Sequence, residues 1–164
     1  AKIFKNINNK SYFFVFCGGN KGNHNYIKSL VSKEKLDDFV KILKFITDDE
    51  LISLYLNCHG VVMPTYCGPT NLPIYESFYF KKIIFYTKDL IPNDEINEHL
   101  VLIDVNSPKD LCKKLEIMFD NQKIEKIVKK NYEYYQLICN ENSFLDNYQK
   151  MLDEFSYLSN RWKS

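Results

Sequence analysis

The feature that most constrains the fold is a regular alternation of short apolar runs with segments of helical pattern. The runs have the length of buried strands and fall at 12–17, 39–45, 60–63, 82–86 and 100–105. Apolar residues recur at helical spacing after four of the five runs, at 24–30, 47–57, 72–80 and 107–119. Strands joined through helices are expected to run parallel, because each helix returns the chain to the edge where the strand began. The sequence therefore predicts an α/β fold, with a parallel sheet and helices on both of its faces.

Two of the predicted helices have clear start signals. Thr47 and Glu50 are spaced as a capping box, and Ser107 stands before Pro108 with Asp110 in the first turn. The acidic run 48–50 suits a helix first turn, where the peptide dipoles favour carboxylates, so we interpret it as a cap and not as a metal site.

The chain is expected to form one domain, residues 1–164, of which 122–164 is a helical tail. The helical pattern of the tail breaks near 140–142. Beyond the break, one apolar stripe recurs at steps of four and three, formed by Phe144, Tyr148, Met151, Phe155 and Leu158. We interpret this stripe as a packing face.

Charge and cysteine content exclude several classes of function. The net charge is +1, which argues against nucleic-acid binding driven by bulk charge. The 5 cysteines form no CxxC pair, so zinc and redox motifs are not predicted, and their odd number favours reduced thiols in a cytoplasmic protein. No apolar run approaches the ~20 residues that span a bilayer, and no signal peptide is visible.

The loop that follows the third predicted strand is the best candidate site. It contains Pro64, Gly68 and Pro69, and leads into a helix with Asn71 as the expected N-cap. The first N–H groups of a helix have no intrahelical partner and carry partial positive charge, so this loop predicts an anion site. Glu76 lies about one turn inside the helix, where its carboxylate can accept a hydrogen bond from a hydroxyl group beside the anion. A phosphate with an attached ribose fits this pair.

Residues 68–76, Gly-Pro-Thr-Asn-Leu-Pro-Ile-Tyr-Glu, resemble the donor-binding loop of retaining GT-B glycosyltransferases of the GT4 type. That family has two glutamates eight positions apart, with a Gly-rich loop and Leu-Pro between them. The resemblance extends through a strand ending in Gly-Gly, an Asp-Glu-Leu-x-x-x-Tyr helix and a strand ending in Pro-Thr. It implies a Rossmann-like domain, the C-terminal half of a GT-B fold, which binds a nucleotide-sugar donor.

The resemblance also implies roles for individual residues. Glu76 would hold the ribose hydroxyls, and the backbone amides of Asn71 and Leu72 would meet the diphosphate. The residues expected to shape the loop and line the donor sugar are Gly68, Pro69 and Thr70.

The ends of the first two predicted strands supply further candidates. Phe45 and Ile46 follow the second strand, where the family packs the nucleotide base; a plain core role for both is the alternative. Gly18 and Gly19 end the first strand and would let the backbone approach the ligand, unless they form an ordinary turn. No catalytic residue is assigned.

The sequence departs from the family pattern at two places. Gly68 stands where the first glutamate is expected, so recognition of the donor sugar would fall to Thr70, Asn71 or backbone groups. Lys81 stands where the family usually has glycine after the helix, and Ile83 replaces a following proline. These two changes affect the turn more than the chemistry.

The expected function, by resemblance, is retaining transfer of a sugar to a glycan or lipid-linked acceptor in polysaccharide biosynthesis. No cofactor and no metal are expected, because fixed dipoles and basic side chains supply the positive field. The acceptor domain and the family's diphosphate-clamping Arg and Lys would lie upstream of Ala1, so these 164 residues alone are expected to be inactive. We expect a cytoplasmic protein, with attachment to the inner face of the membrane left open. Two alternatives remain, a flavodoxin-like binding or interaction module without enzymatic activity and a nucleotide-sugar epimerase domain.

Overall fold

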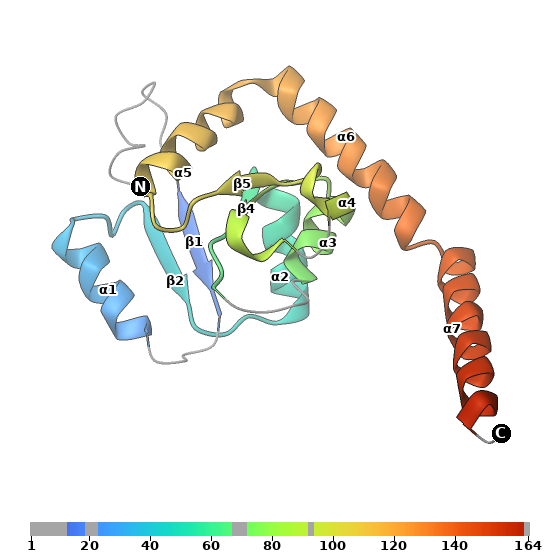
Figure 1. The fold of residues 1–164 in the computed structure, drawn as a ribbon. Helices are drawn as coiled ribbons and strands as arrows, with labels where there is room; N and C mark the ends of the chain where they lie inside the picture. Colours follow the sequence, from blue (N-terminus) through green and yellow to red (C-terminus); the bar gives the residue numbers. More distant parts are fainter. Residues whose placement is uncertain (1–12, 19–22, 67–71, 92–93, 163–164) are drawn as a thin grey trace.

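The computed structural model describes residues 13–18, 23–66, 72–91 and 94–162, and consists of short parallel strands alternating with helices (Figure 1). The strands are β1 (Phe14–Cys17), β2 (Val40–Leu43), β3 (Gly60–Met63), β4 (Ile83–Thr87) and β5 (Val101–Ile103). The α-helices are α1 (His24–Lys33), α2 (Asp48–Asn57), α3 (Leu72–Tyr79), α4 (Asp94–Asn97), α5 (Pro108–Leu115), α6 (Asn121–Ile138) and α7 (Glu141–Trp162). Two 3-10 turns, η2 (Lys88–Leu90) and η3 (Glu116–Phe119), follow β4 and α5.

All strand pairs in the described residues are parallel, which confirms the predicted α/β class. β1 pairs with β2, with Phe14 opposite Val40, whereas β3, β4 and β5 form a separate sheet with β4 in the middle. In the described part of the chain, β1 and β3 therefore have one strand neighbour each. The alternation of strands and helices does not reveal this division, because it carries no information on strand order.

The core is built on both faces of β4, which is buried along its whole length. Ile83 and Phe85 point to one face, where they form a cluster with Ile103 and Leu115. Side chains of a strand alternate between faces, so the intervening residues enter a second cluster on the other side. That cluster contains Ile84, Tyr86, Ile74, Phe78 and Ile96. Each of these large side chains contributes roughly 1.5–3 kcal/mol by leaving water, which explains why β4 is a continuous apolar run.

The predicted helix starts are confirmed. The backbone N–H of Thr47 donates to Glu50 Oε2 at 2.8 Å, and the N–H of Glu50 donates to Thr47 Oγ1 at 3.3 Å, which completes the capping box of α2. At the start of α5, the N–H of Asp110 donates to Ser107 Oγ at 3.3 Å. The acidic first turn of α2 is accordingly part of a cap.

The turn after α3 contains the departure noted in the sequence. Lys81 has φ of 55°, in the left-handed region that favours glycine. The N–H of the following Lys82 donates to the Ser77 carbonyl oxygen at 2.7 Å and closes the helix. The Lys81 ammonium lies 4.3 Å from the centroid of the Tyr132 ring on α6. The lysine therefore gains a contact that glycine lacks, at the cost of an unfavourable backbone conformation.

The tail is helical, as predicted, but its two helices differ in how they pack. α6 lies against α3 and β4, with Asn131 buried, whereas α7 extends away from the rest of the chain (Figure 1). The described side chains of α7, at 142 and 145–157, are all exposed. The stripe residues Tyr148, Met151 and Phe155 are among them, with half or more of each side chain exposed, so this predicted packing face is largely open to solvent; the side chains of Phe144 and Leu158 lie outside the described residues.

Candidate functional site

The predicted anion loop connects β3 to α3, at the carboxyl end of β3, where parallel sheets bind ligands. Four of its site residues, Gly68, Pro69, Thr70 and Asn71, lie outside the described residues, as does Gly19. Leu72 begins α3 with its side chain 66% exposed. An exposed side chain at this position suits a residue that would act through its backbone N–H.

Glu76 lies in the second turn of α3 and is half-buried. Its Oε2 accepts a hydrogen bond of 2.7 Å from the hydroxyl of Tyr55, which lies on α2 and is only 6% exposed. The carboxylate is therefore turned toward α2 and not outward into solvent. This contact joins two helices whose residues are 21 positions apart in the sequence.

Tyr55 is held firmly in this position. Its ring stacks on Phe80, with centroids 5.0 Å apart and planes inclined by 8°. Burial, together with the hydrogen bond to the Glu76 carboxylate, raises the pKa of Tyr55 above its ordinary value, so the hydroxyl keeps its proton and acts as a donor. Leu51, Leu54 and Tyr55 are spaced to form one apolar face of α2. The signal for the second role of Tyr55 was the polar tip that a buried tyrosine must satisfy.

The ends of β1 and β2 bring a second group of candidates together. The N–H of Gly18 donates to the Leu43 carbonyl oxygen at 3.3 Å, and Phe45 and Ile46 lie two and three residues after the end of β2. Gly18 has φ of 155°, which a side chain would make strained. Phe45 is 84% exposed, so the core alternative is wrong for this residue, whereas Ile46 is half-buried.

Helix α2 connects these two groups. It begins at Asp48, directly after the Phe45–Thr47 segment, and Tyr55 lies about two turns along it, or roughly 11 Å at 1.5 Å per residue. A nucleotide whose base reached Phe45 and whose ribose reached Glu76 would lie along this helix.

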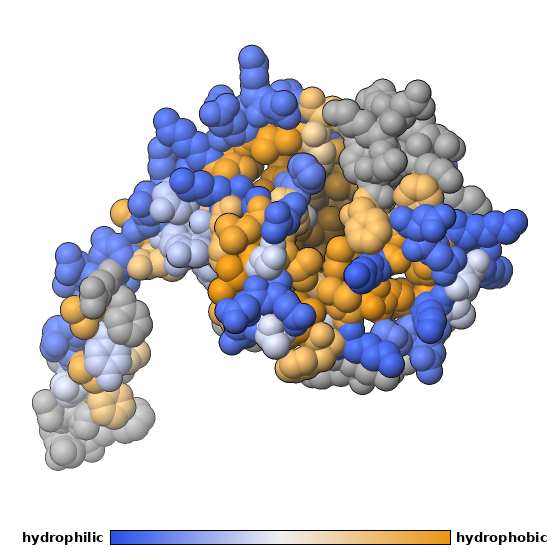
Figure 2. All heavy atoms as spheres, turned by 180° about the vertical axis from the view of Figure 1, so that it is seen from behind, coloured by the Kyte–Doolittle hydropathy of each residue, from blue (hydrophilic) through white to orange (hydrophobic). Residues whose placement is uncertain are grey.

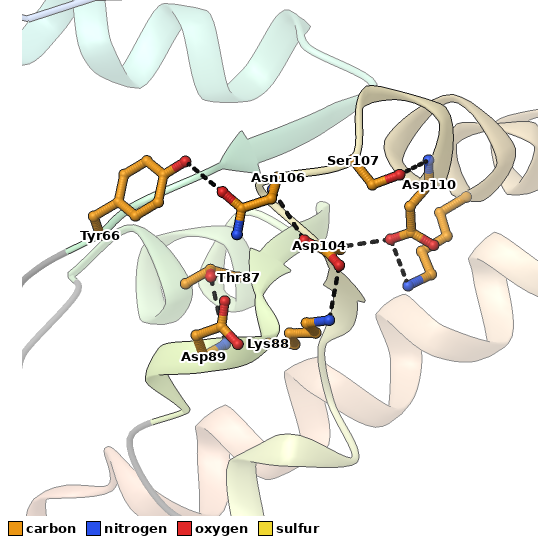
Figure 3. Close-up of polar contacts among 9 residues, drawn as sticks. Tyr66, Thr87, Lys88, Asp89, Asp104, Asn106, Ser107 and Asp110 are labelled. Atoms are coloured by element: carbon orange, nitrogen blue, oxygen red, sulfur yellow. Dashed lines mark hydrogen bonds and ion pairs between the residues drawn. The ribbon is translucent and has the colours of Figure 1, made fainter.

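A third group of residues, all polar or charged, lies at the carboxyl ends of β4 and β5 (Figure 3). Lys88 Nζ lies 2.8 Å from Asp104 Oδ2, and Lys114 Nζ lies 2.9 Å from Asp110 Oδ2. Asp110 also accepts the backbone N–H of Asp104 at 2.9 Å. The hydrogen bonds from Lys88 and Lys114 lower the pKa of Asp104 and of Asp110, respectively. Two lysines and two aspartates thus balance one another, which is typical of a structural network.

Tyr66 connects this network to the start of the anion loop. Its hydroxyl lies 3.5 Å from Asn106 Oδ1, and the backbone N–H of Asn106 donates to Asp104 Oδ1 at 2.9 Å (Figure 3). This contact joins the segment after β3 to the turn between β5 and α5. Tyr66 is the last described residue before the loop. Sequence reasoning did not find this network, because its members are scattered and form no motif.

The described residues give no support for other kinds of site. Among them, no cluster of three or more His, Cys, Asp or Glu side chains is placed to hold a metal ion. Their cysteines, Cys17, Cys58, Cys112 and Cys139, are free thiols. None of their helices combines the length and apolar character needed to cross a membrane.

Two surface depressions, of about 300 and 490 Å³, lie away from Glu76, one between α6 and α7 and one beside α5. Both are open to solvent. The depression beside α5 is lined in part by Asp110 and Lys114 of the polar network, and neither depression is lined by Glu76, Tyr55 or Phe45. Of the site residues predicted around the loop between β3 and α3, Leu72 and Glu76 lie within the described part of the chain.

Solved structures that share this fold include the following three. Sucrose-phosphate synthase from Thermosynechococcus elongatus matches 88% of the chain with a TM-score of 0.70 and 20% identity, over 38% of its own length. TarM matches 91% of the chain with a TM-score of 0.74 and 16% identity, over 30% of its length. The C-terminal domain of the glycosyl transferase group 1 family protein LpcC from Francisella tularensis matches 80% of the chain with a TM-score of 0.62 and 19% identity, over 86% of its length.

These likenesses show the fold, and the chain spans well under half the length of the first two proteins. No curated protein matches the sequence. The sequence model of the glycosyl transferases group 1 family, in contrast, matches residues 1–134, which include every strand and the candidate loop. The chain belongs to the glycosyl transferases group 1 family.

Proposed function

We propose that this chain is the donor-binding C-terminal domain of a retaining GT-B glycosyltransferase of the GT4 type. The observation that supports it best is the half-buried Glu76 on the helix after the β3 loop, fixed by Tyr55 and turned away from open solvent. A solvated helix carboxylate would have no such partner. The family match over residues 1–134 supports the same proposal independently.

In this proposal the donor is a nucleotide-diphosphate sugar. Its ribose hydroxyls bind Glu76, its base packs on the exposed Phe45 beside Ile46, and its diphosphate meets the amides of Asn71 and Leu72 at the start of α3. Negative charge builds on the diphosphate as the glycosidic bond breaks, and the N-terminus of α3 stabilises it. No metal takes part in this scheme, and no residue of this chain is assigned to the chemistry at the sugar carbon.

The rest of the enzyme would supply what this chain lacks. We propose that residues 1–164 form a single donor domain, that an acceptor domain precedes it, and that the acceptor is a glycan or a lipid-linked saccharide. The 164 residues would then bind donor weakly and transfer no sugar. The cytoplasm is the proposed location, with peripheral membrane association an open possibility for the whole enzyme.

The test is a ligand-observed NMR titration of the chain with UDP- and GDP-sugars. Glu76→Ala should weaken binding by roughly 10- to 100-fold, because a hydrogen bond to a charged group is worth about 1.5–3 kcal/mol. Glu154→Ala, on the exposed surface of α7, is the matched control and should leave binding unchanged. Binding that is equal in wild type and Glu76→Ala would refute the proposed role of Glu76. If the wild-type chain binds none of these nucleotide sugars, the result would favour the alternative of an interaction module.

A further inference from the structure

The hydrogen bond between Tyr55 and Glu76 is well placed to fix the direction of the carboxylate. The 2.7 Å separation of Tyr55 Oη and Glu76 Oε2 is that of a strong hydrogen bond between a hydroxyl and a carboxylate. The donor comes from α2 and the acceptor from α3, so the bond also sets how these two helices meet. A single hydrogen bond of this kind restricts rotation about the last torsion of the glutamate side chain.

The carboxylate keeps capacity for a ligand. A carboxylate has about four acceptor positions on its two oxygens, and Tyr55 uses one of them. Within the described ranges, Glu76 Oε1 has no hydrogen-bond donor from the protein. This oxygen is therefore the one left to accept hydroxyl groups from a bound molecule.

The support beneath Tyr55 is rigid. The ring is stacked on Phe80 and 6% exposed, and Ser77, one residue after Glu76, is fully buried with its Oγ donating to the Pro73 carbonyl oxygen at 2.6 Å. A side chain packed in this way loses little further freedom when a ligand arrives. Pre-organisation of this kind raises affinity by lowering the entropic cost of binding.

We propose that Tyr55 is a positioning residue for the donor site: its hydroxyl orients the Glu76 carboxylate so that Oε1 accepts the ribose 2′ and 3′ hydroxyls. This inference rests on the proposed function and adds a specificity to it. Tyr55 makes the site select a ribonucleotide over a deoxyribonucleotide, although it does not touch the nucleotide itself.

The experiment measures this selection directly. The dissociation constants of UDP and of 2′,3′-dideoxy-UDP are determined by NMR titration on the same sample, and GDP and its dideoxy analogue repeat the comparison for the other base. Because both constants come from one sample, any unfolded fraction cancels from their ratio. The wild-type chain should prefer the ribonucleotide by about tenfold or more, the value of one good hydrogen bond to a charged group.

Tyr55→Phe removes the hydroxyl and keeps the ring that stacks on Phe80. It should reduce the preference several-fold and leave the affinity for the dideoxy analogue unchanged. Tyr157→Phe, which removes an exposed hydroxyl on α7, is the control and should behave as wild type. In the Glu76→Ala background, Tyr55→Phe should have no further effect on the ratio, because it acts through the carboxylate.

A second variant leaves Tyr55 intact. In Glu76→Gln, the Tyr55 hydroxyl should hold the amide oxygen, so the NH₂ group faces the ribose where an acceptor is needed and the preference is lost. A glutamine that kept the preference would show that Tyr55 does not fix the orientation, and would overturn the inference.

Different results would overturn the role of Tyr55 and the proposed donor-binding function. An unchanged ratio in Tyr55→Phe, together with loss of preference in Glu76→Ala, overturns the inference and leaves the proposed function standing. A wild-type chain without any ribose preference overturns both.

Discussion

His99 lies two residues before β5 and is 8% exposed. Its Nδ1 is 3.0 Å from Asn131 Oδ1 on α6, and Asn131 Nδ2 donates to the His99 carbonyl oxygen at 2.9 Å. The imidazole also stacks on Tyr134, with ring centroids 4.2 Å apart. This reciprocal pair satisfies two buried polar side chains at once and fixes α6 against the rest of the chain.

The protonation of His99 should make stability depend on pH. Burial lowers its pKa, and Lys130 adds to this effect, whereas the hydrogen bond to the Asn131 side-chain oxygen and the charge of Glu98 oppose it. The unfolded chain therefore binds more protons than the folded chain below the ordinary histidine pKa of about 6.5, so the free energy of unfolding falls as the pH falls through this range. Urea unfolding at pH 7.5 and 5.5 should show the loss.

The variant for this test is His99→Gln, in which the pH-dependent loss should be smaller than in the wild type. His59→Gln is the control, because His59 is exposed, and it should keep the wild-type dependence. Asp104 and Asp110, whose pKa values are lowered, titrate below this window and do not contribute to the difference. An identical pH dependence in His99→Gln and wild type would contradict the prediction.

At the scale of the elements, the capping box of α2 is a local stability device. Thr47→Ala removes the oxygen that accepts the N–H of Glu50, and it should lower the free energy of unfolding by about 1 kcal/mol. Ser53→Ala, within the same helix, is the comparison and should be neutral or slightly stabilising, because alanine favours helix. Chemical denaturation followed by circular dichroism measures both, and equal stability of the two variants would argue against the cap.

Removal of the exposed helix α7, in contrast, should have little effect on stability. All of its described side chains are exposed, so a chain that ends at residue 140 should have a free energy of unfolding within about 0.5 kcal/mol of that of the full chain. The helical circular dichroism signal should fall only by the amount that the residues of α7 contribute. A large drop in the midpoint would show that α7 packs on the domain in solution.

The positions of the strands could be predicted from the sequence to within a few residues, whereas the short helix α4 was not predicted. The predicted strand at 60–63 agrees with β3, and those at 12–17, 39–45, 82–86 and 100–105 contain or overlap the observed strands. Apolar runs and caps are local signals, and local signals locate elements. The contact between Tyr55 and Glu76 was not predictable, because it depends on how α2 and α3 meet in space. The amides proposed to bind the diphosphate stay a prediction.

At the scale of the whole molecule, the sequence correctly predicted parallel strands with helices on both faces, but not the division into two sheets. Strand order follows from which edges meet, and no single segment encodes that. Seen from behind, apolar surface is gathered in the hollowed middle of the molecule (Figure 2). Val15 and Phe16 of β1 are among the large apolar side chains that remain exposed. Exposed apolar surface beside strand edges favours association with further chains.

The division into two sheets should make the strands differ in how often they open locally. β4 has a strand on either side and is buried throughout, whereas β1 pairs with one strand in the described ranges and is largely exposed. Amide protons are replaced by deuterium only when a segment opens, so those of β4 should outlast those of β1 by about 100-fold or more in an NMR exchange experiment. Equal lifetimes in the two strands would mean that both sheets open together, as one cooperative unit.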